Sequence, residues 1–136
     1  SIGKARIFWE GTDITLIATG GILEEAVLAA KELESFGLDV KILGIHTVKP
    51  IDKEEILKSA RETGGLVVIE EHNKDGGLGS AVAEVCMDHA VLPNKFLRIG
   101  LNNTFSSIVG SQHYLRAQYE IDHNAIVSSV KKLFNL

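Results

Sequence analysis

Several features are scarce in this chain of 136 residues, and each scarcity argues against a class of protein. A single cysteine, Cys86, excludes an internal disulfide and suits a reducing compartment, so we expect a cytoplasmic protein. The apolar runs are too short to cross a bilayer, and we expect no signal peptide. Lysine and arginine are scattered singly and the formal net charge is −4, which argues against a nucleic-acid-binding surface.

The rest of the composition is that of an ordinary globular domain. Hydrophobic residues make up 45% of the chain and charged residues 24%. The length predicts one domain with a sizeable core, spanning residues 1–136. Because the first residue is Ser1 and not methionine, we expect this domain to be part of a longer chain.

Short apolar runs alternate with stripes of helical period along the sequence. The expected strands are Ala5–Trp9, Ile14–Thr19, Val40–Ile45, Leu66–Ile69 and Phe96–Gly100. The expected helices are Ile22–Phe36, Asp52–Thr63, Leu78–His89, a short one at Ser111–Leu115, and a last one from Asp122. This alternation predicts a mostly parallel sheet with helices on both faces.

Two helix ends carry specific signals. Gly37 supplies a left-handed cap after the first helix. Asp52 is the expected N-cap of the second helix, and Glu55, three residues later, is expected to reach back to it. Ile51 and Ile56 form a hydrophobic staple across that first turn.

Two glycine-rich loops follow apolar strands and precede helices. One contains Gly20 and Gly21 after Thr19, and the other runs from Asn73 to Gly79 and contains Gly76 and Gly77. Amides at a helix N-terminus attract phosphate or carboxylate, so either loop is a candidate anion site. Neither loop has a complete phosphate-binding fingerprint, and glycines that only allow a turn and close packing are the favoured interpretation.

The densest ionisable group is Glu70-Glu71-His72, at the end of the fourth expected strand. A carboxylate beside a histidine can tune a general base, but neighbouring residues on a strand point to opposite faces. No nucleophile stands out in the same stretch, and the spacing of His46 and His72 matches no known metal site. We therefore assign no catalytic residue and no metal site, and expect these groups to bond to neighbouring backbone.

Taken in order, several motifs resemble the C-terminal domain of the transketolase family of thiamine-diphosphate enzymes. They are Gly11–Gly20, the turn Thr47–Asp52, and Glu70-Glu71-His72 followed by Gly76–Glu84, with Phe105, Leu115, Tyr119 and Asp122 in register. The resemblance covers nearly the whole chain. It departs from the family at Phe105–Val109, where Ser106 and Val109 replace usual glycines, and at Glu120, which replaces another.

The resemblance implies a three-layer α/β/α fold. The sheet would have five strands in the order 1-3-2-4-5, with strand 1 antiparallel. It also implies that thiamine diphosphate and Mg²⁺ bind in other domains of the parent enzyme, and that this domain binds no cofactor and supports a homodimer or a contact with a partner subunit. The candidate interface or anion-binding residues are Gly20, Gly21, Glu71, His72, Gly76, Gly77 and Gly79.

Three functional interpretations stay open from the sequence. The first is a structural domain of a transketolase-like enzyme that transfers two-carbon ketol units between sugar phosphates, inactive by itself. The second is the same domain in a deoxyxylulose-phosphate synthase or in the β subunit of a 2-oxo-acid dehydrogenase. The third is a regulatory module that binds an anion at the glycine loops.

Overall fold

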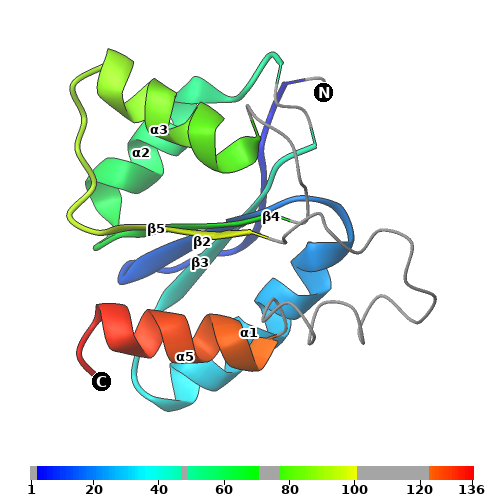
Figure 1. Ribbon diagram of the computed structural model, residues 1–136, viewed down its shortest axis with the longest axis vertical. Coiled ribbons are helices and arrows are strands. Elements are labelled where there is room, and N and C mark those ends of the chain that lie inside the picture. Colours follow the sequence, from blue (N-terminus) through cyan, green and yellow to red (C-terminus); the bar gives the residue numbers. More distant parts are fainter. Residues whose placement is uncertain (1–2, 47–48, 71–76, 101–122) are drawn as a thin grey trace.

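The computed structural model describes residues 3–46, 49–70, 77–100 and 123–136. A five-stranded sheet with the order β1-β3-β2-β4-β5 forms its central layer (Figure 1). The strands are β1 (Arg6–Trp9), β2 (Ile14–Ala18), β3 (Val40–Gly44), β4 (Leu66–Glu70) and β5 (Phe96–Gly100). β1 pairs with β3 in antiparallel orientation, and the other pairs are parallel. The predicted strand order and orientation are confirmed.

Helices cover both faces of the sheet. α2 (Lys53–Glu62) and α3 (Leu78–Asp88) lie on one face, and α1 (Leu23–Ser35) and α5 (His123–Leu133) lie on the other (Figure 1). A single 3₁₀ turn, η1 (Gly20–Ile22), leads into α1. The predicted three-layer architecture is therefore confirmed. The expected helix at Ser111–Leu115 and the cap at Asp122 lie outside the described residues.

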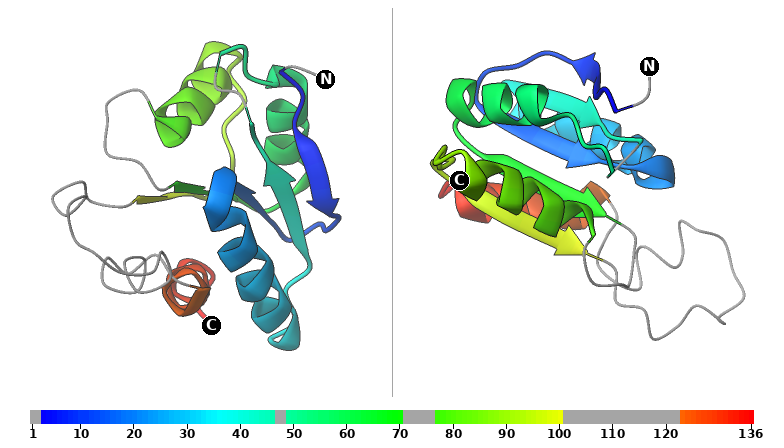
Figure 2. Two further views of the ribbon diagram at one scale, coloured as in Figure 1. Left: turned by 90° about the vertical axis from the view of Figure 1, so that its right-hand side faces the viewer. Right: turned by 90° about the horizontal axis from the view of Figure 1, so that it is seen from above.

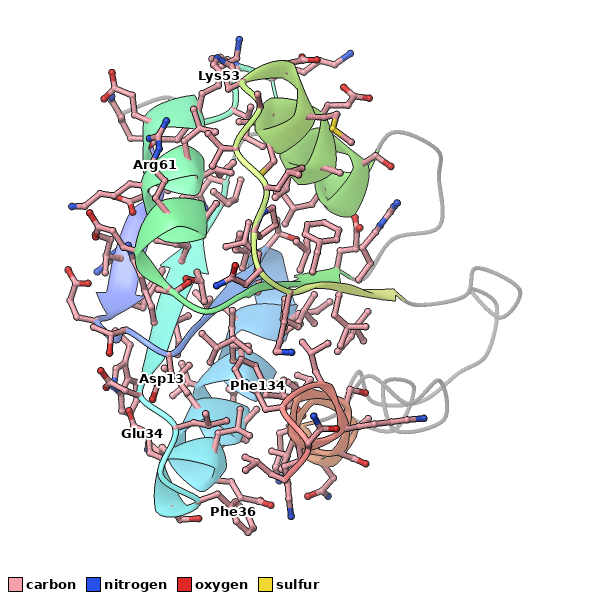
Figure 3. The ribbon with its side chains drawn as sticks, turned by 90° about the vertical axis from the view of Figure 1, so that its left-hand side faces the viewer. Asp13, Glu34, Phe36, Lys53, Arg61 and Phe134 are labelled. Carbon is pink, nitrogen blue, oxygen red and sulfur yellow. The ribbon has the colours of Figure 1, made fainter. Side chains whose placement is uncertain are left out.

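Two hydrophobic clusters separate the layers, and side chains fill the space on both sides of the sheet (Figure 3). β2, β3 and β4 are buried along their whole length, as expected for parallel strands covered on both faces. Successive strand residues enter opposite clusters. In β4, Val67 and Ile69 face α1 and α5, while Leu66 and Val68 face α2 and α3.

Two of the predicted helix-end signals are present in the structure. Gly37 has φ +91°, the left-handed conformation that follows the end of α1. The Asp52 carboxylate caps α2, where Oδ1 accepts a hydrogen bond from the amide of Glu55 at 3.2 Å. The other oxygen, Oδ2, accepts from the amide of Ala5 at 2.8 Å, so the same side chain also holds the start of β1.

The prediction for the side chain of Glu55 is wrong. Its carboxylate accepts hydrogen bonds from Lys41 Nζ at 2.8 Å and from Ser59 Oγ at 3.2 Å, and does not reach back to Asp52. Lys41 lies on the buried strand β3 with only 3% of its side chain exposed. A buried ammonium group needs a paired carboxylate, and this requirement outweighs the weaker capping bond.

Replacing Asp52 with alanine removes both of its hydrogen bonds. We expect the free energy of unfolding to fall by about 1–2 kcal/mol, the usual range for loss of an N-cap side chain. Asp52→Asn keeps an acceptor oxygen and is expected to lose less than half of that. Urea unfolding followed by circular dichroism measures both values, and equal losses would contradict the capping role of the side-chain oxygen.

The aromatic residues of β1 are only partly covered. Trp9 packs against the domain's own core on the α1 side. Ile7 and Phe8 are just over one third exposed, and the guanidinium group of Arg6 lies 4.7 Å from the centroid of the Phe8 ring. The apolar surface at this edge is therefore small.

Candidate functional site

The carboxyl ends of the parallel strands form one edge of the sheet. β2 lies between β3 and β4, and its helix α1 lies on the opposite face from α3, the helix that follows β4. The point between the ends of β2 and β4 is therefore a topological switch point, where open α/β sheets usually bind ligands. Thr19 and Gly20 follow β2 at this point, and Glu70 is the last residue of β4.

Glu70 caps the N-terminus of α3. Its Oε1 accepts a hydrogen bond from the amide of Leu78 at 2.7 Å, and its Oε2 accepts one from the amide of Gly79 at 2.8 Å. The N-cap residue Gly77 has no side chain that could make these bonds. Glu70 is only 5% exposed, so its carboxylate fills the place that a bound anion takes at other helix N-termini.

Two side chains approach Gly79 closely. A Cβ atom at this position would lie 2.4 Å from Arg98 Nε and 2.9 Å from Glu70 Oε2. Arg98 comes from the neighbouring strand β5, and its terminal nitrogen donates to Ser80 Oγ at 3.1 Å. The start of α3 is thus held by side chains from the ends of β4 and β5.

A second buried carboxylate contacts the start of α5. Glu25, in the first turn of α1, is 3% exposed. Its Oε1 accepts a hydrogen bond from the amide of His123, the first residue of α5, at 3.1 Å, and His123 Nδ1 lies 3.7 Å from the same oxygen. Two helix N-termini, those of α3 and α5, therefore contact carboxylates of the chain itself.

The other glycine loop has a different geometry. Gly20 has φ +53°, a conformation that favours glycine, and begins η1 together with Gly21. Thr19 makes no capping hydrogen bond with its side chain, and its carbonyl oxygen accepts from the amide of Ile22 at 3.2 Å. The glycines here allow a tight turn between β2 and α1.

Comparison with known proteins identifies the family. The family model of the transketolase C-terminal domain matches residues 3–126. The chain belongs to this family. The predicted resemblance is confirmed, and the strand order described above is the one that it implied.

Relatives share the domain as part of longer proteins. The chain is 38% identical over 133 residues to a 6-deoxy-6-sulfo-D-fructose transketolase subunit of Clostridium sp. (strain MSTE9), covering 98% of this chain and 40% of that one. It is 38% identical over 130 residues to a 1-deoxy-D-xylulose-5-phosphate synthase of Geobacter metallireducens, covering 96% of this chain and 21% of that one. The chain therefore spans two fifths or less of the length of these two relatives.

A solved structure of a transketolase has the same fold as this chain. A split-gene transketolase, described as an inactive β4 tetramer, superimposes with a TM-score of 0.87 at 34% identity. The match covers 100% of this chain and 44% of that one. In that protein, too, the transketolase C-terminal domain is less than half of the chain.

The predicted site residues are described only in part. In this transketolase C-terminal domain, Gly20 and Gly21 lie in η1, just before α1, and Gly77 and Gly79 lie at the start of α3. Glu71, His72 and Gly76 lie outside the described residues, as does the altered loop Phe105–Val109. The two described glycine pairs follow β2 and β4, which are neighbours in the sheet.

Sequence reasoning did not assign the capping role of Glu70, although it favoured bonds from this polar stretch to nearby backbone. A signal was available. Glu70 continues the alternation of Leu66 and Val68, the β4 residues that face α2 and α3. The side chain most suited to reach the start of α3 was therefore Glu70.

The described residues contain no group of three or more His, Cys, Asp or Glu side chains that could hold a metal ion. They also contain no helix long and apolar enough to cross a membrane. His89 is an exposed residue at the end of α3, with Nδ1 2.9 Å from the carbonyl oxygen of Val85. Its position is explained by a contact within its own helix.

Cys86 is a buried thiol on α3 that is 3% exposed. Burial raises the pKa of this thiol above its ordinary value, so less of it is thiolate at a given pH. We expect Ellman's reagent to react with the folded chain at pH 8 at least about tenfold more slowly than with the urea-unfolded chain. Equal rates would contradict the burial of this residue.

Proposed function

We propose that this chain is the C-terminal structural and dimer-interface domain of a thiamine-diphosphate-dependent enzyme. The parent enzyme transfers two-carbon ketol units between sugar phosphates. The family match and the split-gene transketolase structure support this proposal. Thiamine diphosphate and Mg²⁺ bind to other domains, either on the same polypeptide or on a partner subunit. The cofactor supplies the carbanion chemistry, and this domain stabilises the contact between subunits or domains.

The observation that carries this proposal is the position of Glu70. Its carboxylate occupies the helix N-terminus at the switch point, where a phosphate or carboxylate ligand would otherwise bind. An anionic ligand would have to displace Glu70 and would be repelled by it. The arrangement favours a structural role over the regulatory anion-binding module. Phosphate or a sugar phosphate at millimolar concentration is accordingly expected to leave the melting temperature unchanged.

The surface that we propose for the contact between subunits or domains lies at the carboxyl edge of the sheet. Its residues are Gly20, Gly21, Glu71, His72, Gly76, Gly77 and Gly79. The polar, glycine-bounded composition of this stretch and its position after neighbouring strands support the assignment. Glu70 and Arg98 hold the start of α3, where Gly77 and Gly79 lie.

His72→Ala in the parent enzyme is expected to weaken subunit association or ketol transfer by about tenfold, the effect of one or two lost interface contacts. The matched control is His89→Ala, which removes an exposed histidine at the opposite end of α3. Sedimentation velocity measures association, and a coupled assay measures transfer. If both variants behave like the unmodified enzyme, His72 is ordinary surface.

A second candidate function assigns the same domain to a different parent enzyme. The 38% identity to a 1-deoxy-D-xylulose-5-phosphate synthase favours that enzyme as the alternative, and the β subunit of a 2-oxo-acid dehydrogenase has the same domain by resemblance. The test is a product assay on the native protein that carries this chain, together with any chain that co-purifies. A transferred ketol unit on an aldose phosphate supports the transketolase. Formation of 1-deoxy-D-xylulose 5-phosphate supports the alternative.

A further inference from the structure

β5 is an edge strand whose outer side has no partner among the described residues. It pairs only with β4, and it lies at the opposite edge of the sheet from β1, as the right-hand view of Figure 2 shows. The amide of Leu66 donates to the carbonyl oxygen of Lys95 at 2.9 Å. In a parallel pair, only every second residue of a strand directs its N–H and C=O groups toward the partner strand. Because Lys95 faces β4, the N–H and C=O groups of Leu97 and Ile99 also face β4.

The peptide groups of Phe96, Arg98 and Gly100 therefore point away from β4. Nothing in the part of the chain that the structure describes pairs with them, so they form a row of hydrogen-bonding groups that is a template for pairing with another strand. Proteins that bind extended peptides use such an edge for main-chain bonds and adjoining pockets for side chains.

Two hollows flank this edge, one on each face of the sheet. The first has a volume of about 310 Å³ and is almost wholly apolar. Its lining residues are Ala83, Cys86, Met87, Leu92, Pro93 and Phe96. The second, of about 500 Å³, is lined by Leu97, Ser129, Lys132 and Leu133. One β5 side chain thus lines each hollow. If another strand paired with β5, its successive side chains would enter the two hollows in turn.

The exposed apolar residues of the first hollow are large. Met87 is 68% exposed and Leu92 is 71% exposed, more than the other large hydrophobic residues that the structure describes. Methionine adapts its shape to different apolar partners. Burying the apolar surface of these two side chains against a partner would stabilise the complex.

Three cations lie around β5, and one carboxylate, that of Glu70 at the end of β4, lies beside Arg98. Lys95 precedes the strand, Arg98 lies on it, and Lys132 lines the second hollow. The ion pairs found among the described residues involve none of these three cations. In a chain with a net charge of −4, this cationic edge is complementary to an acidic partner.

We propose that the outer edge of β5 binds an extended segment of another protein chain, in which aspartate or glutamate residues flank apolar side chains. The segment pairs with the peptide groups of Phe96, Arg98 and Gly100, and its apolar side chains enter the two hollows. Its acidic side chains pair with Arg98 and Lys132. This inference does not depend on which reaction the parent enzyme catalyses.

A second copy of this domain is not the occupant. Two β5 strands related by a two-fold axis would bring Arg98 and Lys132 close to the same cations of the other copy. Like charges facing each other across paired strands are destabilising, and a cation on an edge strand is a common protection against self-pairing.

Hydrogen exchange on the native assembly, purified from its own cells, tests the proposal. The amides of Arg98 and Gly100 are expected to exchange at least about a hundredfold more slowly in the assembly than after its chains are separated. The amides of Leu97 and Ile99 serve as internal controls, since β4 protects them in both states. Fast exchange at Arg98 and Gly100 in the intact assembly would overturn the proposal.

The identity of the occupant is tested by zero-length carbodiimide cross-linking of the same assembly. A cross-link from Lys95 or Lys132 to an aspartate or glutamate of a different chain segment supports the proposal. Slow exchange together with cross-links only to this same domain in another copy would overturn it in favour of self-association. Neither outcome depends on ketol transfer, so failure here is distinguishable from failure of the proposed function.

A charge reversal gives an independent readout. Lys132→Glu is expected to weaken binding of the cross-linked segment, made as a synthetic peptide, by about tenfold. The matched control is Lys53→Glu, at the exposed first residue of α2, which lies far from α5 (Figure 3). Equal affinities for the two variants would show that the charge at Lys132 has no part in binding.

Discussion

Glu70→Ala is expected to lower the free energy of unfolding by about 3 kcal/mol. The substitution removes two hydrogen bonds, of 2.7 and 2.8 Å, from a carboxylate that is 5% exposed. The amides of Leu78 and Gly79 then lie at a helix N-terminus without an acceptor, and buried donors of this kind cost about 1–3 kcal/mol each. Urea unfolding of the chain measures the loss.

Two further variants separate the capping role from a general effect of charge. Glu70→Gln keeps one acceptor oxygen but places an amide group opposite a backbone donor, so we expect about half of the alanine loss. Glu84→Ala removes an exposed carboxylate from the same helix and is expected to change stability by less than about 0.5 kcal/mol. A Glu70→Ala loss no larger than that of Glu84→Ala would contradict the capping role.

Gly11→Ala is expected to destabilise the domain by about 3–4 kcal/mol, through a steric clash with backbone. A Cβ atom at Gly11 would lie 2.3 Å from the carbonyl carbon and oxygen of Val40 and 2.7 Å from the amide nitrogen of Lys41. β3 is paired on both sides, with β1 and with β2, so its backbone cannot move away cheaply. Thermal unfolding by calorimetry measures this effect.

The matched control is Gly100→Ala at the end of β5. A Cβ atom at Gly100 would meet no atom of the described residues within 4 Å. We expect this variant to stay within about 0.5 kcal/mol of the unmodified chain. If Gly11→Ala were as mild as this control, close packing would not explain the glycine at position 11.

Much of this fold follows from local sequence patterns. β2 is apolar except for Thr15, and β4 is apolar as far as Ile69. The helices between them carry stripes of helical period, so alternating elements on a parallel sheet were predictable. Asp52 and Gly37 mark helix ends by side-chain and backbone chemistry that acts within a few residues. The antiparallel first strand and the strand order came from the family resemblance, not from the pattern itself.

The contacts that define the site depend on the folded structure. Arg98 reaches Ser80 because β5 lies beside β4, and no local pattern contains that information. Glu25 and His123 are 98 residues apart and meet only when α5 packs against α1. Glu55 was predicted from a local capping pattern, and the prediction failed because the tertiary fold places the buried amine of Lys41 beside it.

The most direct test of the proposed role is a titration with thiamine diphosphate and Mg²⁺. It is performed by calorimetry on the isolated chain and, in parallel, on the native assembly that contains it. A domain without a complete active site predicts saturable binding to the assembly and no binding to the isolated chain at millimolar cofactor. Saturable binding to the isolated chain, or none to the assembly, would contradict the assignment of this chain as the C-terminal interface domain of a thiamine-diphosphate enzyme.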